Sequence, residues 1–569
     1  MKKSTITILF AALSLMQVNA ATWVVNNTEA IAEGPASTTE GSLSYCIGNA
    51  ADNDIIVFDA GMSGQSIEFL SAVKVEKSLT FDASSLLLPV SFDAKGNNQI
   101  MMLSNYANRN NNSQVNKFYN IIFKNGAAHV GDEPGAVGIY ASKVYFTGCQ
   151  FLNNKSDTGT GRQPGAIRCI SPLAFIYFNN CIFRGNESVR QGGVISVDIA
   201  HVEIDGCLFE SNLAGISGAA IDIKGGTKSG ANTFPSLTIR NSTFLNNTAN
   251  VVSGKSANGT VICCNQDNGY PIYLFNNTFV GNMNNNNSNA AIYTNADDIF
   301  MGGNLFGGNK YNAASGIQYS NDVRIGSNKK ITSYGYNIYY GIMPNSAEEM
   351  SSTDREYRAW TAAPYVEAVA NVAGVCVPNE TNGLWKDLKV IPNALLCEFI
   401  GENPVDQTGA PRTGKLGFIG AYEFPSYVLE VTDDRFASTP GNGETVYKAG
   451  ETVELNNVSG EFVSWYINGQ HYTDNPKQLV MDNDYSVAAN YEQISAIENI
   501  LVADAQIYLS GTTLQVKNLT DSSVVIYSIG GQQVISQVVV SGSGSIDLIN
   551  LPHGIYIVKA GNRVKKIVR

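Results

Sequence analysis

Residues 202–212 read Val202-Glu203-Ile204-Asp205-Gly206-Cys207-Leu208-Phe209-Glu210-Ser211-Asn212. The stretch alternates apolar and polar residues, passes through the turn-forming pair Asp205-Gly206, and continues as a second short run around Phe209. Alternation of period two, followed by a corner, is typical of two short β-strands joined by a sharp bend. The stretch therefore predicts a bent β-ribbon whose apolar residues share one side.

The same pattern recurs along the chain. Equivalent phenylalanines stand at positions 123, 151, 183, 209, 244, 279 and 306, at intervals of 26 to 35 residues. The strand that carries the Phe mostly ends three residues later at an Asn, and a further strand starts with Gly or Ala 9 to 15 residues after most Phe. A fixed motif with variable filler at this period indicates a solenoid. We therefore predict an all-β chain built on a right-handed parallel β-helix with three short strands in each coil.

Counting back from the Phe separates core positions from exterior positions, because side chains alternate along a strand. The residues five and seven before the Phe are mostly large and apolar, so the residue six before it should point outward. Aromatic rings on a solenoid exterior can stack against sugar rings, and four candidate binding residues stand at this outward position: Tyr145, Tyr177, Tyr273 and Phe300. The alternative is that aromatic residues are simply favoured on pleated surfaces and pack against one another.

A charged corner is the second candidate site. Lys155, Asp157 and Arg162 follow one Phe, while Glu187 and Arg190 follow the next Phe at the equivalent corner. Basic groups near a carboxylate could bind a uronic acid and neutralise it for β-elimination, as polysaccharide lyases do. The weak catalytic candidates are therefore Lys155, Arg162, Glu187 and Arg190. The alternative is a solvated loop whose ion pairs contribute little.

Other chemistry has less support in the sequence. Hydrolysis of a glycoside would need paired carboxylates, and Asp297-Asp298 is the one tempting pair near the repeats, although adjacent residues on a strand face opposite ways. Polygalacturonases carry a Gly-His-Gly motif, and none of the four His has that context. Zinc spacings, a P-loop and a nucleophile elbow are not apparent. Asp52 and Asp54 could bind Ca²⁺ but belong to no wider pattern, so we predict no cofactor and no metal.

The composition and the N-terminal sequence limit the class of ligand and the location of the protein. The 569 residues carry a formal net charge of −12, which argues against general nucleic-acid binding. Lys2 and Lys3, an apolar run over 6–15 and small residues up to Ala20 predict a signal peptide cleaved after Ala20. The run is too short to cross a bilayer, and no later stretch is long enough to do so.

Nine cysteines raise the question of disulfides in an exported protein. Cys149, Cys181 and Cys207 each precede a repeated Phe by two residues, which stacks them on the inward face. We interpret these three as core thiols, with bridges between coils as the minority alternative. Cys376 and Cys397 lie outside the repeats and are the better disulfide candidates.

One row of exterior positions is unexpectedly apolar. The residues directly before four of the repeated Phe are Ile122, Ile182, Leu208 and Leu305. Exposed apolar rows of this kind are rare on soluble proteins. We therefore expect long corner loops or a partner to cover this row.

Several short motifs resemble bacterial β-helix proteins of the choice-of-anchor Q type over residues 40–424. The opening carries Gly41-Ser42-Leu43, Asp54-Ile55-Ile56-Val57-Phe58 and Gly64-Gln65-Ser66-Ile67. The closing piece carries Gly335-Tyr336-Asn337-Ile338, then residues 406–412 (Asp-Gln-Thr-Gly-Ala-Pro-Arg) and 419–423 (Ile-Gly-Ala-Tyr-Glu). The chain departs from that family at Ala363-Pro364-Tyr365, where an Asp-Pro is usual. The resemblance implies a secreted or surface-attached β-helix and supplies no activity.

The C-terminal part resembles two further families. Residues 427–493 resemble the small β module called the divergent internalin-B-type repeat, which is a spacer or adhesive module. Residues 506–569 resemble the type A C-terminal sorting domain of the type IX secretion system, through the Gly554-Ile555-Tyr556 strand and the basic strand with Lys565 and Lys566. This resemblance implies an immunoglobulin-like β-sandwich recognised at the outer membrane, with sorting residues Gly554, Tyr556, Lys565 and Lys566. It also implies that the sandwich is removed on export, and that the passenger is released or coupled to surface polysaccharide.

These observations predict five segments: a signal peptide (1–20), a capped β-helix (21–425), a small β module (426–493), a linker (494–505) and a sorting domain (506–569). We predict a type IX-exported protein, secreted or attached to the outer face of the outer membrane, with the secretion machinery as one partner. Its expected role is non-enzymatic, either adhesin-like contact with carbohydrate or host surface, or a structural spacer. The alternative function is a polysaccharide lyase that acts on acidic polysaccharide.

Overall fold

The structure is a computed structural model that describes residues 20–491 and 506–569, apart from gaps at 110–112, 130–132, 158–162, 172–173, 225–234, 250–257, 266–268, 286–289, 296, 314, 327–328, 344–346, 357–365, 371–375, 379–383, 413, 520–521, 540–541 and 561–562. The predicted signal peptide, apart from Ala20, lies outside the described residues, as do Arg162 and the linker. The chain divides into two compact units, Met1–Asn490 and Tyr491–Arg569.

One coil shows how the first unit is built. Strand β16 (Phe175–Asn179) turns into β17 (Ile182–Arg184), then β18 (Glu187–Ser188), then β19 (Ile195–Val197). Each pairs in parallel with its counterpart in the next coil: β20 (His201–Asp205), β21 (Leu208–Glu210), β22 (Leu213–Ala214) and β23 (Ile221–Ile223). The predicted parallel β-helix is therefore confirmed. The prediction of three strands per coil was incomplete, since a two-residue strand such as β18 is too short to show any periodicity.

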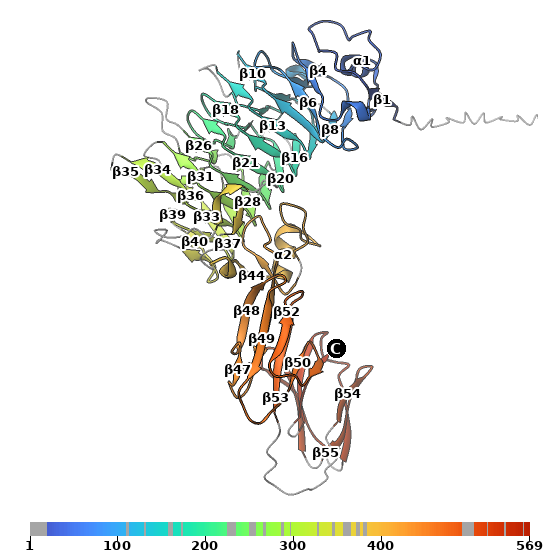
Figure 1. Ribbon diagram of the computed structural model, residues 1–569, viewed down its shortest axis with the longest axis vertical. Helices are drawn as coiled ribbons and strands as arrows, with labels where there is room; N and C mark the ends of the chain where they lie inside the picture. The colour runs from blue at the N-terminus through green and yellow to red at the C-terminus, as the bar shows by residue number, and fades with distance from the viewer. Residues whose placement is uncertain are drawn as a thin grey trace, which may run out of the picture. The chain divides into compact units, whose positions relative to one another are not determined.

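Stacking the coils makes four sheets in the described part of the solenoid, whose strands follow one another in chain order from blue to yellow-green (Figure 1). The first sheet has twelve strands and begins each coil. Besides β16 and β20, it contains β1 (Thr22–Val25), β2 (Ile55–Phe58), β5 (Thr80–Asp82), β8 (Val115–Tyr119), β12 (Lys143–Thr147), β24 (Leu237–Arg240), β28 (Ile272–Phe275), β32 (Ile299–Gly302), β37 (Lys330–Gly335) and β40 (Ala347–Glu349).

The second sheet has eleven strands and carries the repeated Phe. Besides β17 and β21, it contains β3 (Ser66–Glu68), β6 (Val90–Asp93), β9 (Ile121–Lys124), β13 (Gln150–Leu152), β25 (Thr243–Leu245), β29 (Thr278–Val280), β33 (Leu305–Gly307), β38 (Ile338–Tyr339) and β41 (Arg355–Glu356).

The third sheet, of eight strands, consists mainly of two-residue pieces. Besides β18 and β22, it contains β10 (Ala127–Ala128), β14 (Lys155–Ser156), β26 (Thr248–Ala249), β30 (Met283–Asn284) and the hairpin of β34 (Lys310–Ala313) and β35 (Gly316–Tyr319). The fourth sheet, of ten strands, completes the coils. Besides β19 and β23, it contains β4 (Val73–Val75), β7 (Met101–Leu103), β11 (Val137–Ile139), β15 (Ile167–Cys169), β27 (Ile262–Cys264), β31 (Ala290–Thr294), β36 (Asn321–Ile325) and β39 (Ile342–Met343).

The repeated phenylalanines form a continuous stack inside the solenoid. From Phe123 to Phe306 each ring stacks on the next, with centroids 4.4 to 5.1 Å apart. All of these rings are buried. Aromatic pairs at this spacing add attraction beyond the area that they remove from water. The inward register inferred from the sequence is therefore confirmed.

The asparagines that end the Phe strands form a buried ladder beside this stack. In each rung the side-chain amide of one Asn donates to the side-chain carbonyl of the Asn in the next coil at 2.9 to 3.0 Å, through Asn154, Asn186, Asn212, Asn247, Asn282 and Asn309. The same amide also donates to a backbone carbonyl, as Asn186 does to Phe151. The ladder ends on the buried carboxylate of Asp322, 2.9 Å from Nδ2 of Asn309. Burial of these polar groups is tolerated because each finds a partner.

The predicted corners adopt the expected backbone. Gly148, Asn180, Gly206, Asn241 and Gly303, each the second residue of a corner between the first and second sheets, have φ values between 46° and 67°. Asn and Gly accept this left-handed conformation more readily than other residues. At the N-terminal end, helix α1 (Leu43–Asn49) begins after Ser42, whose Oγ accepts a hydrogen bond from the backbone N–H of Tyr45.

A closing segment covers the apolar exterior row. It comprises η4 (Leu384–Leu388), β44 (Lys389–Pro392), α2 (Asn393–Ile400), β45 (Leu416–Phe418) and the residues up to Glu423. Its apolar side chains, among them Leu396, Phe399 and Ile419, form a second core with Leu208, Leu245, Val280 and Leu305. Gln407 Nε2 donates to the carbonyl of Cys207, and Ala421 N donates to Thr278 Oγ1. The expectation of corner loops or a partner was therefore wrong for Leu208 and Leu305, because a segment that follows the coils covers them and also contacts Ile182. Ile122 lies outside this second core and is half-buried.

Two smaller β structures follow the solenoid. In the first unit, β46 (Ser426–Thr432), β47 (Ser438–Thr439), β48 (Gly443–Lys448), β49 (Thr452–Asn457), β50 (Phe462–Ile467), β51 (Gln470–Tyr472), β52 (Lys477–Val480) and β53 (Tyr485–Tyr491) form two sheets around Trp465. The hairpin of β42 (Val366–Ala370) and β43 (Cys376–Pro378) precedes the closing segment, and short turns η1 (Ala60–Met62) and η2 (Tyr106–Asn108) lie near the N-terminal end.

The second unit is a sandwich of two antiparallel sheets. One contains β54 (Gln506–Ser510), β55 (Thr513–Leu519) and β58 (Gly542–Asp547), and the other contains β56 (Ser522–Ser528), β57 (Gln533–Val539), β59 (Ile555–Ala560) and β60 (Arg563–Val568). Their facing side chains, including Val516, Ile526 and Val558, form one buried core. No helix among the described residues of either unit is long and apolar enough to cross a membrane.

The cysteines of the repeats are buried free thiols, as interpreted. The Sγ atoms of Cys149, Cys181 and Cys207 each donate to the carbonyl of a phenylalanine of the preceding coil, 3.4 to 3.6 Å away. Burial raises the pKa of Cys149 and Cys181, which suppresses thiolate chemistry. The expectation that Cys397 forms a disulfide was wrong, because its thiol is free. The side chain of Cys376 lies outside the described residues.

Candidate functional site

The exterior of the first sheet carries a regular grid of side chains, which we call the aromatic face. The grid consists of alternate residues on three adjacent strands, held in line by the parallel register: Lys143, Tyr145 and Thr147 on β12, Phe175, Tyr177 and Asn179 on β16, and His201, Glu203 and Asp205 on β20. The intervening residues, such as Ile176 and Ile204, are buried in the solenoid. Strand alternation therefore places all nine side chains on the outer side of the sheet.

Aromatic rings occupy the centre of the grid. The rings of Tyr145 and Tyr177 lie edge to face with centroids 6.3 Å apart, and Phe175 lies 5.9 Å from Tyr145. Phe175 also stacks on His201 with centroids 5.0 Å apart. All four rings are partly exposed. The result is an apolar platform edged by polar groups, with the Oη of Tyr177 accepting a hydrogen bond from Asn179.

The third strand of the grid adds charge and hydrogen bonding. His201 Nε2 lies 3.1 Å from Glu203 Oε1, while His201 Nδ1 lies 2.8 Å from Ser236 Oγ. The hydrogen bond from His201 lowers the pKa of Glu203. Burial raises the pKa of Asp205, whose Oδ1 accepts a hydrogen bond from Asn241. Glu203 and Asp205 thus stand on the same face of one strand, and their pKa values are shifted in opposite directions.

The other two predicted aromatic residues form a separate pair. Tyr273 on β28 and Phe300 on β32 stack with centroids 4.9 Å apart and are both partly exposed. Between this pair and Tyr177 lie Glu203 and Thr238 in the same row of the sheet. At about 4.8 Å between strands, Tyr177 and Tyr273 stand roughly 14 Å apart. The row therefore offers two aromatic patches along the solenoid axis.

The charged corner is assembled as predicted around Lys155 and Glu187. These residues are register partners on β14 and β18, and Nζ of Lys155 lies 3.7 Å from Oε2 of Glu187. Lys155 also borders a hollow of about 330 Å³, together with Lys95, His129 and Asp157. His129 Nδ1 lies 3.0 Å from Asp157 Oδ2. The hollow thus brings together cationic groups and an imidazole–carboxylate pair.

The two arginines of the predicted corner have different outcomes. Arg162 lies outside the described residues, so its place in the corner stays a prediction. Arg190 lies in the turn after β18, where its backbone N–H donates to Ser188 Oγ and its carbonyl accepts from Ile216. These backbone bonds fix the turn next to Glu187.

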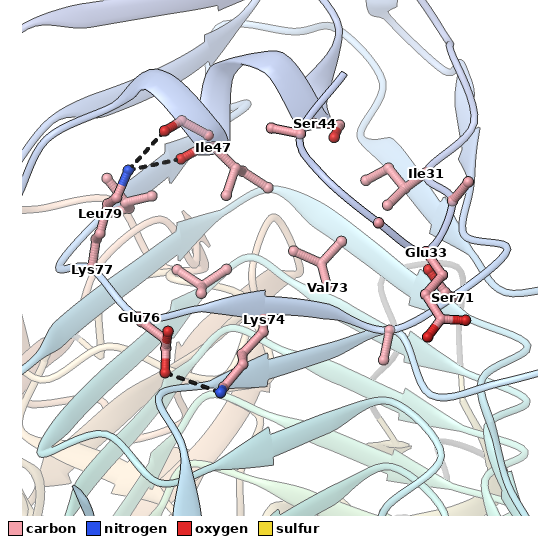
Figure 2. Close-up of a pocket in the computed structure, with 16 residues that line it drawn as sticks. Ile31, Glu33, Ser44, Ile47, Ser71, Val73, Lys74, Glu76, Lys77 and Leu79 are labelled. Carbon is pink, nitrogen blue, oxygen red and sulfur yellow. Dashed lines mark hydrogen bonds and ion pairs between the residues drawn. The ribbon is translucent and has the colours of Figure 1, made fainter. Parts of the chain in front are cut away.

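A second hollow, of about 350 Å³, lies at the N-terminal end of the solenoid between α1 and β4. Figure 2 shows Ile47 of the helix and Val73 of the strand facing it, with Lys74 and Glu76 on its lower side. Nζ of Lys77 donates to the carbonyls of Gly48 and Ala50 at the end of α1, and Lys74 pairs with Glu76 at 3.0 Å. The side chains of Lys74, Glu76 and Lys77 therefore already have partners, either each other or the end of helix α1.

The two carboxylates considered as calcium ligands, those of Asp52 and Asp54, accept hydrogen bonds mainly from backbone amides. Asp54 accepts hydrogen bonds from Ala21 N, Ala51 N and Trp23 Nε1, and Asp52 Oδ1 accepts one from Ser78 N. In the Asp297-Asp298 pair, Asp297 accepts from the N–H of its neighbour and Asp298 accepts from Lys330 N, as expected of turn residues. Among the described residues, no group of three or more His, Cys, Asp or Glu side chains is arranged to hold a metal ion.

Sequence reasoning missed part of the aromatic face. It identified Tyr145 and Tyr177 but not Phe175, His201 and Asp205, which stand two residues to either side of that row. The signal was available in principle, because every second residue of a strand shares its face. It also missed the pairing of His129 with Asp157, which are 28 residues apart in sequence.

Residues 506–569 match the family model described as a secretion system C-terminal sorting domain. The tail is a type IX secretion sorting domain. The protein is therefore one that the type IX system exports, to be secreted or displayed at the cell surface. A comparison with curated proteins gives no match for the chain. Within this domain, Lys565 and Lys566 are exposed on β60, whereas Tyr556 is buried and its Oη donates to the carbonyl of Pro552.

Proposed function

We propose that the exported protein is a non-enzymatic surface or secreted protein that binds polysaccharide through the aromatic face. The observation that carries the proposal is the platform of Tyr145, Phe175 and Tyr177, partly exposed and edged by Asn179, Glu203 and His201. Sugar rings need both an apolar surface and hydrogen-bonding groups at its edge. The platform offers both, on a rigid sheet whose side chains are already in place before binding.

The arrangement along the solenoid supports a polymeric ligand. The pair of Tyr273 and Phe300 continues the same row roughly 14 Å beyond Tyr177, at about 4.8 Å per strand. A polysaccharide lying along the axis would contact both patches. Because the polymer is already bound at the first patch, contact with the second patch would raise its affinity without a second loss of translational and rotational entropy. The ligand would then be a polysaccharide from the environment or from a host surface.

The test is binding of the exported full chain to immobilised polysaccharides. Tyr177→Ala should weaken binding by at least about 10-fold, as expected when roughly 1.4 kcal/mol of contact is lost. Tyr106→Ala is the control, because Tyr106 is an exposed aromatic residue on η2 and is not one of the nine residues of the grid. Equal binding by the wild type and both variants, or binding by none of them, would refute the proposal.

The charged corner supports the second candidate function, a polysaccharide lyase. The favouring observation is the hollow that joins Lys155 to the His129–Asp157 pair. Lys155 would neutralise the carboxylate of a uronic acid, and the imidazole of His129 would remove the proton from the carbon next to that carboxylate. β-Elimination requires both of these steps. Ultraviolet absorbance of unsaturated ends, released from acidic polysaccharide with and without Ca²⁺, tests it. Product that is lost in Lys155→Ala and His129→Ala would establish the lyase.

Two further assignments rest on resemblance. We infer that residues 40–424 belong with choice-of-anchor Q β-helix proteins and that 426–493 form an internalin-B-type spacer or adhesive module. From the charged start and the apolar run that follows it, we also infer that 1–20 are a cleaved signal peptide. The motif that supports the first assignment has a structural role here, because Gln407, Arg412 and Glu423 attach the closing segment. A protein that binds no glycan and cleaves none would be a structural spacer.

A further inference from the structure

We propose that cleavage between Ala20 and Ala21 completes a buried ion pair between the new α-ammonium group of Ala21 and the carboxylate of Asp54, and that this pair fastens the N-terminal cap of the solenoid. The inference rests on the signal-peptide cleavage inferred above and is independent of polysaccharide binding. It assigns a processing site and, in Asp54, the group that receives the amine which processing creates.

The first support is the place of Asp54 in the cap. Its side chain is only 4% exposed and lies in the turn between α1 and β2. Its Oδ1 accepts a hydrogen bond from Ala21 N at 2.7 Å, while its Oδ2 accepts one from Ala51 N at 2.8 Å and one from Trp23 Nε1 at 2.9 Å. Strand β1 and helix α1 lie next to each other at this end of the solenoid (Figure 1). One carboxylate thus joins β1, the end of α1 and the start of β2.

The second support is the charge of this site. The hydrogen bonds from Trp23 and Ala51 lower the pKa of Asp54, so the carboxylate is ionised at neutral pH. All three of its hydrogen-bond donors are neutral groups. Lys77 acts on the carboxylate through space, but its Nζ donates to the carbonyls of Gly48 and Ala50. Because a buried carboxylate is costly without an opposite charge beside it, the site calls for a cation.

The third support is that Ala21 is held where the new charge forms. Its nitrogen lies against Asp54, and its carbonyl accepts a hydrogen bond from Ile55 N at 2.9 Å. Both backbone groups of Ala21 are therefore anchored, and its nitrogen stays beside the carboxylate when the preceding peptide bond is cut. Ala20 is exposed, so its loss removes nothing from the core.

The chemical step is hydrolysis of one peptide bond by a signal peptidase. The water oxygen bonds to the carbonyl carbon of Ala20, and the bond from that carbon to the nitrogen of Ala21 breaks. Ala20 leaves as a carboxylate, and both hydrogens of the water end on the nitrogen, which becomes an ammonium group. An ordinary α-amino group has a pKa of about 7.7–8.0, so it is mostly cationic at neutral pH. The neutral donor to Oδ1 of Asp54 thus becomes a charged one, which forms a stronger hydrogen bond.

The ion pair exists only in the processed protein. An unprocessed chain has a neutral amide beside Asp54, so the contact between β1, β2 and α1 lacks its charge-assisted bond. The cap then opens more often, because less free energy holds it against the first coils. Removal of the signal peptide is thereby coupled to closure of the end of the solenoid.

The experiment compares two chains that differ by one residue, 21–569 and 20–569, each released from an N-terminal fusion by a protease that leaves no extra residue. In 20–569 the charge is displaced by one residue, about 3.8 Å, and Ala21 N remains an amide. At pH 7.5 an amine-reactive label should modify the α-amine of 21–569 at least about 10-fold more slowly, since pairing with Asp54 holds the amine protonated. Hydrogen exchange of the amides in residues 43–58 should also be at least about 10-fold slower in 21–569.

Two substitutions identify the partner of the amine. Asp54→Asn removes the charge and keeps the shape, so it should abolish both differences between the two chains. Asp52→Asn is the matched control, because Asp52 lies in the same turn and its Oδ1 accepts from Ser78 N. Both differences should persist in that variant. Comparing the two chain lengths within each variant cancels any general loss of stability.

The outcomes separate this inference from the proposed function. N-terminal sequencing of the protein recovered from cells tests the cleavage, and a first residue other than Ala21 would overturn the processing site. Equal labelling and exchange in the two chains would overturn the ion pair, as would differences that survive Asp54→Asn. Ala21 as the first residue, with both differences lost in Asp54→Asn, would establish it. None of these results bears on the binding test with Tyr177→Ala, so either proposal can fail alone.

Discussion

The guanidinium of Arg412 and the carboxylate of Glu423 meet inside the closing segment, with Nη1 and Oε2 3.2 Å apart and both side chains almost inaccessible to water. Lys389 contacts the other oxygen of Glu423 at 2.9 Å, and Arg412 also donates to the carbonyls of Phe418 and Gly420. Buried ions are tolerated when every hydrogen-bonding position is filled in this way. The cluster therefore ties together the strands that cover the apolar exterior row.

Removing one member of this cluster should detach the closing segment. Arg412→Met leaves Glu423 and the two carbonyls without that donor, which we expect to cost about 3–5 kcal/mol. The segment should then expose Leu208, Leu245 and Leu305, the row that it covers. Limited proteolysis near residue 400 and increased binding of a hydrophobic dye would report this. The control is Lys415→Met, because Lys415 makes only exposed ion pairs with Glu430 and Glu444. Equal protease resistance of the two variants would contradict the prediction.

Truncation of one ring in the phenylalanine stack should destabilise the solenoid strongly. Phe209 is buried between Phe183 and Phe244, so Phe209→Ala removes two stacking contacts and leaves a cavity. We expect a cost of about 3–5 kcal/mol in the free energy of unfolding. Thermal melting of the full chain measures it, with Phe436→Ala as the control because that ring is 81% exposed. A melt identical to wild type would show that Phe209 is not packed as described.

The buried carboxyl group at the end of the asparagine ladder should make stability depend on pH. Burial raises the pKa of Asp322 from 3.8 to about 7, despite hydrogen bonds from Asn309 and Tyr340 N. Between these two values the folded state holds a proton that the unfolded chain has lost. The stability that the protonated Asp322 contributes to the folded state is therefore fully present below about pH 4. It is lost as the pH rises through 7, which lowers the free energy of unfolding by on the order of 4 kcal/mol.

Denaturant unfolding of wild type and Asp322→Asn at pH 5 and pH 8 isolates this effect. Asn cannot ionise, so the stability of wild type relative to the variant should fall between the two pH values. The comparison cancels the other titrating groups, because both chains share them. Parallel pH profiles would mean that Asp322 has an ordinary pKa in the folded protein.

The exposed lysines of β60 should matter for export rather than for folding. Lys566→Glu reverses one charge in a tail that, from residue 551, carries five Lys or Arg and no Asp or Glu. We expect the full-length protein to accumulate inside the cell envelope while its sandwich stays folded. Cell fractionation with an antibody against the β-helix measures this. Lys517→Glu, on the other sheet of the sandwich, is the charge-matched control. Normal secretion of Lys566→Glu would exclude this residue from recognition.

Much of the solenoid could be predicted because its information is local and repeated. The spacing of Phe151, Phe183 and Phe209, together with turn residues such as Gly206, defines core, corner and exterior within a few residues of each motif. The two-residue strand β18 escaped prediction because its pairing comes from the coils above and below it. Its own residues, Glu187 and Ser188, contain no periodic signal.

The candidate sites were predicted less completely. Tyr145 and Tyr177 were recognised because each occupies a position that can be counted from a Phe. The contact of Phe175 with His201 depends on the register of strands 26 residues apart, and the pairing of His129 with Asp157 depends on how two corners meet. Single positions in a repeat can be identified from sequence, whereas the distances between them require the coils to be stacked.

The sequence by itself determined the repeat, the inward phenylalanines and the sorting tail, because short periodic patterns and motifs specify local backbone and burial. The tertiary structure alone decided what covers Leu208 and which exterior side chains meet. Residues 384–423 reach the apolar row through contacts more than 100 residues distant in sequence, such as Thr278 with Ala421. Contacts of that range arise from complementary packing of whole elements, and no local pattern encodes them. The same packing leaves the grid around Tyr177 and Glu203 partly exposed.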